Sequence, residues 1–526
     1  MKRIYILDTT LRDGAQTSSI SFTVQDKLTI FKMLEEFGVD FIESGWPGAN
    51  DVDTQVFSEI TSPLKTAFCM TAKVGINPQN DENLKHVNSV SQNITIVGKS
   101  SAFHVREAIN TALEKNLESI TNSVKFFTEK EKIVIFDAEH FFDGFKENSE
   151  YSLQCIESAH NSGASFVTLC DTNGGTLPDE IFEIVSRVKE RFPEIKLGIH
   201  AHNDCDCAVA NTLAAVKAGC IMIQGTINGL GERCGNASLT SLLPILVLKL
   251  DYDCGEINKN IHKITELSHT LSGILNEHHN NHMPFTGSSA FAHKGGLHAS
   301  AVLKNPKLYE QIQPELVGNK RKILISNQSG RSNVISMLSD VGIVNYTEDD
   351  IQKITKELKK KNLEGYSYEG ADASFYILAK GIINQYEENN EFYKVLSYKT
   401  QVERRHNSRG GLCTSSEGIV KIEYDGQPYL NVAEGSGPVD AIYNAMHAIL
   451  LQRYSQIKNL KLNDYKVRII NSGMGTQSKT LVLIEFLNSD NANTFITVGV
   501  SENIIDASFI ALNDAIVYFL DFSRKA

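Results

Sequence analysis

Short apolar segments alternate with amphipathic, helix-like stretches over roughly the first 250 residues of the chain. Residues 24–37 and 179–192 have apolar side chains at three- and four-residue spacing, which is typical of helices. Eight segments have the length of a strand: residues 4–8, 41–45, 66–72, 94–98, 133–139, 166–171, 197–202 and 221–227. Such alternation indicates parallel strands joined by crossover helices. Eight units in about 250 residues predict an α/β fold of the (β/α)8 barrel type.

An open, doubly wound sheet is the alternative for this alternation. That fold would carry a Gly-x-Gly-x-x-Gly turn after its first strand. Asp8-Thr9-Thr10 stands there instead, so the closed barrel is favoured.

Residues 256–390 differ from the barrel-like part, because helix-like stretches predominate there. We expect them to form a mainly helical linker subdomain, which leaves residues 1–255 as the catalytic barrel. The polar segment 386–391 is typical of a linker. It predicts that a third domain follows, over residues 391–526.

The third domain contains an internal duplication. Residues 431–450 align with residues 497–516 at a constant offset of 66, and strand-like runs precede each copy. The matched pairs are Val432 with Val498, Asp440 with Asp506, Ala441 with Ala507, and Ala445 with Ala511. We predict a pseudo-twofold α+β domain of two β-β-β-α copies. A ligand could bind at its seam, or the domain could serve packing or dimerisation alone.

The composition excludes some partners. The chain has 51 Lys and Arg against 63 Asp and Glu, a formal net charge of −12. Nucleic acids and anionic membranes attract positive surfaces, so neither is expected as a partner. The nine cysteines show no Cys-x-x-Cys spacing, and no apolar run approaches the roughly 18 residues of a membrane span. We therefore expect a reduced, cytoplasmic protein.

Polar and ionisable residues gather where several of the predicted strands end. In a barrel, these strand ends surround the mouth of the active site. The segments concerned are residues 8–14, 137–140, 171–175, 200–204 and 229–236, which follow the first, fifth, sixth, seventh and eighth strands. Their joint presence predicts an active site at this end of the barrel.

His200 and His202 stand two residues apart on the predicted seventh strand, so their side chains leave the same face. Two imidazoles and a carboxylate from a neighbouring strand form an open metal site, and Asp13 is the best-placed third ligand. A hydrogen-bonded structural pair is the alternative for the two histidines. Nitrogen and oxygen donors together permit Zn²⁺, Mn²⁺ or Mg²⁺.

Arg12 precedes Asp13 in the chain. A metal with open positions can chelate a 2-oxo acid and polarise its carbonyl, and a guanidinium alongside would stabilise the oxygen as it becomes an alkoxide. Thr172 could donate a hydrogen bond to the substrate carboxylate. The structural alternatives are a salt bridge at the barrel floor for Arg12 and a helix N-cap for Thr172.

Several motifs together resemble the family of 2-isopropylmalate, homocitrate and citramalate synthases. DTTLRDG at 8–14, HAHND at 200–204 and GERCGNA at 231–237 are typical of the family. The matches to its citramalate synthase branch are ESGWPGAN (43–50), FDAEHFFDG (136–144), LCDTNGGTLP (169–178), QGTINGLGERCGNA (224–237), AHKGGLHASAVLKNP (292–306), EGSGPVDA (434–441), DYKVRI (464–469) and VGVSENIIDAS (498–508). The similarity extends over essentially the whole chain.

The resemblance implies a metal-dependent Claisen condensation in a (β/α)8 barrel. Pyruvate and acetyl-CoA would give citramalate and free CoA, on the route from pyruvate to isoleucine. A 2-isopropylmalate synthase or another enzyme that condenses a 2-oxo acid with acetyl-CoA is the close alternative. A metal-dependent aldolase or lyase and an inactive amino-acid-sensing protein are the other hypotheses.

The C-terminal domain resembles an allosteric dimerisation domain that binds a branched-chain amino acid. This resemblance implies a homodimer, with isoleucine as the natural feedback effector. The sequence itself does not distinguish this regulatory role from a packing role.

Carried over position by position, the resemblance implies four ligands for a divalent metal ion. Asp13, His200, His202 and Asn236 match these ligands. Arg12 matches the residue that polarises the keto group of the 2-oxo acid.

The resemblance also implies residues for carboxylate binding and proton transfer. Thr172 matches the residue that holds the oxo-acid carboxylate, and Glu139 an acid that orients or assists the base. His298, in Gly-Gly-Leu-His, resembles the residue that serves as or supports the base. Glu139 and His293 compete with it for this role, and an ordinary histidine on a helix surface is the structural alternative.

Overall fold

The computed structural model describes residues 2–525 apart from 19, 278, 294–297, 299–300, 303, 324–330, 369, 385–390, 407–411, 471–477 and 491–492. The chain forms two compact units, which are described separately. The first contains Met1–Phe291 and Ile312–Arg321, and the second contains Ala292–Gln311 and Lys322–Ala526. Of the predicted linker 386–391, all but residue 391 lies outside the described residues.

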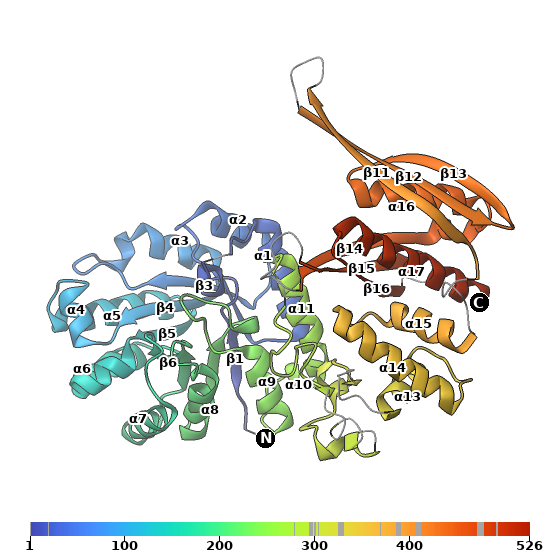
Figure 1. Cartoon of the computed structure of the whole chain (residues 1–526). Helices are drawn as coiled ribbons and strands as arrows, with labels where there is room; N and C mark the ends of the chain where they lie inside the picture. Colours follow the sequence, from blue (N-terminus) through green and yellow to red (C-terminus); the bar gives the residue numbers. More distant parts are fainter. Residues whose placement is uncertain are drawn as a thin grey trace. The chain divides into compact units, whose positions relative to one another are not determined.

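Eight parallel strands close into a barrel in the order β1 to β8, with β8 paired to β1 (Figure 1). The strands are β1 Tyr5–Asp8, β2 Phe41–Gly45, β3 Lys65–Met70, β4 Asn93–Lys99, β5 Ile133–Glu139, β6 Phe166–Asp171, β7 Leu197–Ala201 and β8 Met222–Gly225. Each predicted strand agrees with these bounds to within two residues. The prediction of a (β/α)8 barrel is confirmed, and the open sheet is excluded.

Helices follow the strands in alternation. They are α1 Val24–Phe37, α2 Asp51–Glu59, α3 Glu82–Val90, α4 Ala102–Glu107, α5 Leu113–Thr128, α6 Phe141–Asn161, α7 Pro178–Arg191, α8 Ala208–Ala218, α9 Leu239–Leu248, α10 Ile257–Asn260 and α11 Ile264–Ile274. Local sequence sets the ends of α1, since Thr23 and Asp26 form a capping box before it and Gly38 ends it at φ 98°. No helix in the described part of the chain is both long and apolar enough to cross a bilayer.

The interior of the barrel changes from apolar to polar along the strands. A buried cluster of side chains from four strands fills its lower part: Leu7, Ile135, Phe166 and Met222. Since side chains alternate along a strand, Asp137 and Glu139 point to the same side as Ile135, and Gln224 points to the same side as Met222. Polar groups therefore collect above an apolar floor, at the C-terminal strand ends.

Helices follow two short strands in the second unit. Its helices α13 Arg331–Asp340, α14 Glu348–Glu364 and α15 Asp372–Asn384 pack in succession. The two short strands β9 Ala292–His293 and β10 Lys322–Ile323 pair in parallel. The predicted mainly helical region is confirmed, whereas the predicted domain boundaries after residues 255 and 390 stay predictions.

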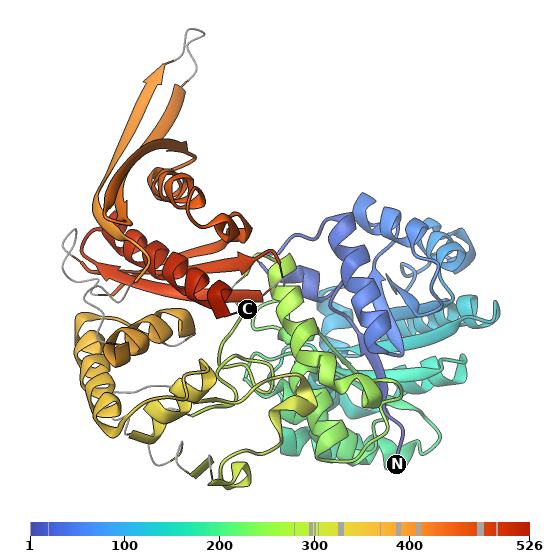
Figure 2. The ribbon, with the colours of Figure 1, turned by 90° about the vertical axis from the view of Figure 1, so that its right-hand side faces the viewer.

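Two antiparallel, three-stranded sheets follow, each with the helix of its own copy against it (Figure 2), and α15 also contacts the second sheet. The first copy consists of β11 Lys394–His406, β12 Leu412–Tyr424, β13 Gln427–Gly435 and α16 Pro438–Leu451. The second consists of β14 Leu460–Ile469, β15 Thr480–Asn488, β16 Asn493–Ser501 and α17 Ile504–Lys525. The predicted duplication of a β-β-β-α unit is confirmed.

Glycine and alanine let helix and sheet approach closely in both copies. A Cβ atom on Gly418 would lie 2.5 Å from the carbonyl oxygen of Ala441, and one on Gly499 only 1.9 Å from that of Ala507. A side chain at either glycine would therefore collide with the helix backbone, so both strand positions require glycine.

We predict that Gly499→Ala destabilises the second unit by about 1–3 kcal/mol, because the added methyl group overlaps the backbone of α17. Thermal and urea unfolding of the whole chain would measure the loss. Gly273→Ala is the control, since Gly273 lies inside a helix and a Cβ there meets no atom within 4 Å. Equal stability of the two variants would contradict the packing argument.

Candidate active site

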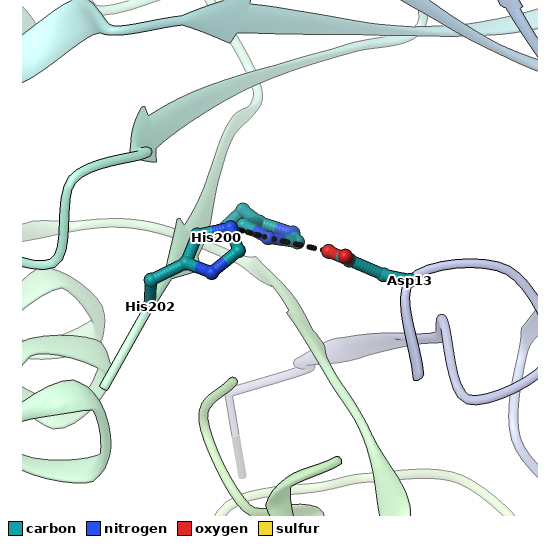
Figure 3. Close-up of side chains that lie close together, drawn as sticks. All are labelled: Asp13, His200 and His202. Atoms are coloured by element: carbon teal, nitrogen blue, oxygen red, sulfur yellow. Dashed lines mark hydrogen bonds and ion pairs between the residues drawn. The ribbon is translucent and has the colours of Figure 1, made fainter. Parts of the chain in front are cut away.

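Asp13, His200 and His202 meet at the C-terminal end of the barrel (Figure 3). His200 Nε2 lies 3.1 Å from Asp13 Oδ2 and 3.3 Å from His202 Nε2. All three side chains are buried, and one possible ligand atom from each lies within 4.8 Å of the others. The loop after β1 and the end of β7 thus bring together three predicted metal ligands.

A chain of hydrogen bonds in the barrel interior orients His200. Gln224 donates from Nε2 to Asp137 Oδ1 (2.7 Å) and to Thr168 Oγ1 (3.1 Å). Its Oε1 atom is 2.8 Å from His200 Nδ1 and can only accept, so Nδ1 carries a proton and donates it. His200 Nε2 is thereby left facing Asp13. A buried partner that fixes the second ring nitrogen is typical of metal-binding histidines.

Asn236, the fourth predicted ligand, is joined to His202 by a backbone bridge. Its Nδ2 atom donates to the carbonyl of Leu230 at 3.1 Å. Its Oδ1 atom is buried, and no described residue donates a hydrogen bond to it. A buried carbonyl oxygen without a donor is costly unless a cation or water satisfies it, so the donor set fits a divalent metal ion.

Charge coupling sets the protonation states of this cluster. Burial opposes the charge of Asp13, but Arg12 and His200 hold the pKa of Asp13 well below its usual range. Burial and then the neighbouring His200 lower the pKa of His202 to about 4. Burial also opposes the charge of His200, yet its bond to Asp13 raises the pKa of His200. At neutral pH Asp13 is a carboxylate and His202 a neutral imidazole, which suits metal binding, whereas a metal must displace the proton that Asp13 stabilises on His200.

Arg12 is held rigidly beside Asp13. Its Nε atom donates to Glu43 Oε2 at 2.6 Å, and its guanidinium lies 4.2 Å from the centre of the Phe68 ring. Burial opposes its charge, but Glu43 and Asp13 raise the pKa of Arg12, which therefore stays protonated. The salt bridge considered for Arg12 exists, but at the strand ends beside the cluster and not at the barrel floor. No role was assigned to Glu43 from the sequence. Its position could have indicated one, because it is an acidic residue within the otherwise mainly apolar strand β2.

Thr172 follows β6 and lies next to the end of β5. Its Oγ1 atom accepts a hydrogen bond from the backbone N–H of His140 at 2.9 Å. The N-cap considered for Thr172 is wrong, because α7 begins at Pro178 and its N-cap is Leu177. The half-buried hydroxyl can still donate its own hydrogen, so its role in holding a substrate carboxylate stays a prediction.

Glu139 ends β5 and forms an ion pair with Lys99, with Nζ 2.6 Å from Oε2. His140 Nε2 lies 4.0 Å from the other carboxylate oxygen, and the rings of His140 and His104 stack at 3.6 Å. Sequence reasoning placed Glu139 at the mouth but did not find Lys99. Asp171, also expected there, instead accepts a hydrogen bond from Thr176 within its own loop.

The two candidate base histidines outside the barrel belong to the second unit. His298 is exposed, and its ring stacks on Tyr309 with centroids 4.2 Å apart. His293 Nε2 lies 3.3 Å from Glu310 Oε1. The assignment of the base to either of them stays a prediction.

Comparison with known proteins identifies the family. Residues 3–271 match the family model described as HMGL-like, residues 285–365 the homocitrate synthase post-HMGL domain-like model, and residues 369–520 the LeuA allosteric (dimerisation) domain. A protein of Aquifex aeolicus named (R)-citramalate synthase is 46% identical over 99% of this chain and 98% of its own. The chain belongs to the (R)-citramalate synthase family.

Other relatives agree with this membership. An (R)-citramalate synthase of Geobacter sulfurreducens is 41% identical over 100% of this chain and 99% of its own. A 2-isopropylmalate synthase of Listeria innocua is 29% identical over 97% and 95% of the two chains. Membership in the citramalate synthase family therefore has stronger support than the 2-isopropylmalate alternative.

We predict that Asp13→Asn weakens divalent metal binding by at least about 10-fold, because it removes an anionic oxygen ligand. Titration calorimetry of the metal-free protein with Mn²⁺ would measure the affinity. Asp171→Asn is the matched control, a buried strand-end aspartate outside the cluster, and should bind Mn²⁺ as the wild type does. Unchanged affinity in Asp13→Asn would remove Asp13 from the metal site.

A second prediction concerns pH. Burial, and then the charge of Glu43, raise the pKa of Asp137 from 3.8 to about 7. The folded chain thus keeps a proton that the unfolded chain releases, and the free energy of unfolding decreases as the pH rises from about 4 to about 7. Asp137→Asn lacks this titration and keeps an acceptor for Gln224. Over this pH range, the free energy of unfolding of Asp137→Asn should increase by up to about 4 kcal/mol relative to that of the wild type.

Urea unfolding of both metal-free proteins at several pH values would measure this difference. Parallel stability profiles for wild type and Asp137→Asn would show that Asp137 does not titrate in this range.

Proposed function

We propose that this chain catalyses the metal-dependent condensation of acetyl-CoA with pyruvate to give (R)-citramalate and CoA, as an acyltransferase of isoleucine biosynthesis. The observation that carries the proposal is the cluster of Asp13, His200 and His202 beside the guanidinium of Arg12. This arrangement suits a 2-oxo acid, which presents a carboxylate and a keto oxygen. Full-length similarity to proteins named (R)-citramalate synthase supports pyruvate as that acid.

Each residue near the keto acid has a distinct task. A divalent ion, Mg²⁺, Mn²⁺ or Zn²⁺, held by Asp13, His200, His202 and Asn236 would polarise the keto carbonyl as a Lewis acid. Arg12, fixed by Glu43, donates a hydrogen bond to the keto oxygen, and this bond strengthens as negative charge develops on that oxygen. Thr172 donates to the pyruvate carboxylate.

Proton transfer starts the reaction. The methyl group of acetyl-CoA must lose a proton before its carbon can attack the keto carbon, so a base must lie within reach of it. We assign this role to Glu139, which ends β5 on the inward side, and keep His298 as a supporting base. After the carbon–carbon bond forms, the alkoxide takes up a proton, and water hydrolyses the thioester to release CoA.

The second unit would regulate the enzyme. Its match to the LeuA allosteric (dimerisation) domain supports a homodimer in which a branched-chain amino acid, isoleucine, binds as feedback inhibitor. The cytoplasmic location expected from the sequence stays a prediction, as does the absence of nucleic-acid and membrane partners.

The test is a CoA-release assay with pyruvate, 2-oxoisovalerate and 2-oxoglutarate, with and without isoleucine. We expect pyruvate to give the highest kcat/KM, no turnover without divalent metal, and a lower rate with isoleucine. Preference for 2-oxoisovalerate would contradict the proposal and favour a 2-isopropylmalate synthase. Failure to consume acetyl-CoA with any acid would favour a lyase or a sensing protein.

A further inference from the structure

Lys99 and Glu139 end the neighbouring strands β4 and β5 and form an ion pair whose lysine has no role in the steps above. The two residues are directly paired in the parallel register, so their side chains leave the same face of the sheet. Asp137, two residues before Glu139, contacts Gln224 of β8 within the barrel. Lys99 and Glu139 therefore point inward, at the mouth.

The ion pair of Lys99 and Glu139 is mostly buried, but solvent still reaches both side chains. The side chains of Lys99 and Glu139 are 18% and 23% exposed. An ammonium group has three N–H donors, and in the described part of the chain Glu139 is the only group paired with Lys99 Nζ. Donors of Lys99 therefore remain for a substrate atom beside Glu139.

Three other basic side chains at this end of the barrel serve other groups or are neutral. Arg12 is bound to Glu43 beside the metal ligands. Arg233 donates twice to Asp204, at 2.7 and 2.9 Å. Burial, and then the adjacent His140, lower the pKa of His104, which is neutral at pH 7.

The reaction creates negative charge on two different oxygens. Arg12 and the metal ligands serve the keto oxygen of the 2-oxo acid. Before the attack on the keto carbon, loss of the methyl proton places negative charge on the thioester oxygen of acetyl-CoA. This proton transfer is slow unless a hydrogen-bond donor lies close to that oxygen. Preorganised donors at such an oxygen are among the largest contributions to catalysis.

We propose that Lys99 is a catalytic residue whose ammonium group binds the thioester oxygen of acetyl-CoA and stabilises the enolate. The inference rests on the proposed function. The methyl C–H bond breaks, its proton passes to the Glu139 carboxylate, and its electron pair forms the C=C bond as the carbonyl pair moves onto oxygen. One negative charge thus moves from Glu139 to the thioester oxygen. Lys99 lies beside both positions, so the charge stays paired until the carbon attacks pyruvate.

The experiment compares Lys99→Met and Lys99→Arg with wild type in the CoA-release assay, using the full chain with its metal. We expect Lys99→Met to lower kcat by about 10²–10³-fold, the effect of removing one oxyanion donor. The KM for pyruvate should change by less than about 3-fold, because Lys99 acts on the other substrate. Lys99→Arg should keep at least about 10-fold more activity than Lys99→Met, since it retains a cationic donor.

A double variant separates direct action from action through Glu139. If Lys99 binds the thioester oxygen, adding Lys99→Met to Glu139→Gln should lower the remaining turnover at least about 10-fold further. No further loss would show that Lys99 acts only by placing Glu139 and would overturn the proposal. A kcat for Lys99→Met within about 3-fold of wild type, or a loss confined to the KM for pyruvate, would overturn it as well.

Lys146→Met is the matched control, because this lysine pairs with Glu180 at 3.6 Å and is 39% exposed. Its kcat should equal that of wild type, and thermal unfolding should show that all variants fold. Wild-type protein is assayed first. If it releases no CoA with pyruvate, the proposed function and this inference both fail, whereas an active wild type with an equally active Lys99→Met removes only the inference.

Discussion

The pairing of β1 with β8 is the constraint on which the site depends. Four consecutive residue pairs, from Tyr5 with Met222 to Asp8 with Gly225, close the sheet on itself. Closure brings the loop after the first strand beside the seventh and eighth strands. Without it, Asp13 would be separated from His200 by the width of an open sheet, since strands lie about 4.8 Å apart. The metal ligands are thus a product of barrel closure.

Closure also buries charged groups above the apolar part of the barrel interior, which is unfavourable unless they have partners. Each of these groups has a partner in the structure. Arg12 is bound to Glu43, Asp137 accepts from Gln224, and Lys99 lies beside Glu139. Buried charges without such partners would be strongly unfavourable. The same partners hold the side chains in fixed orientations, which is the preorganisation that a condensation reaction needs.

The net charge of −12 therefore carries no information about the site. In the proposed function, an anionic 2-oxo acid would be attracted by Arg12 and by the metal ion that Asp13, His200 and His202 would hold. The C-terminal domain, in contrast, is built from two copies of one β-β-β-α unit. Gly418 and Gly499 are required because in each copy the helix approaches its sheet to backbone contact.

The sequence by itself determined the elements and the strand ends that bear the site. Periodicity and capping are local properties, so α1 was predicted at residues 24–37 as observed, and the duplication was visible as a constant offset of 66. It also pointed to Asp13, His200 and His202, because residues at parallel strand ends share one mouth. Tertiary structure alone decided the partners. Glu43 for Arg12, Lys99 for Glu139 and Gln224 for His200 are contacts between strands distant in the chain, set by register and side-chain direction, and local patterns do not encode these.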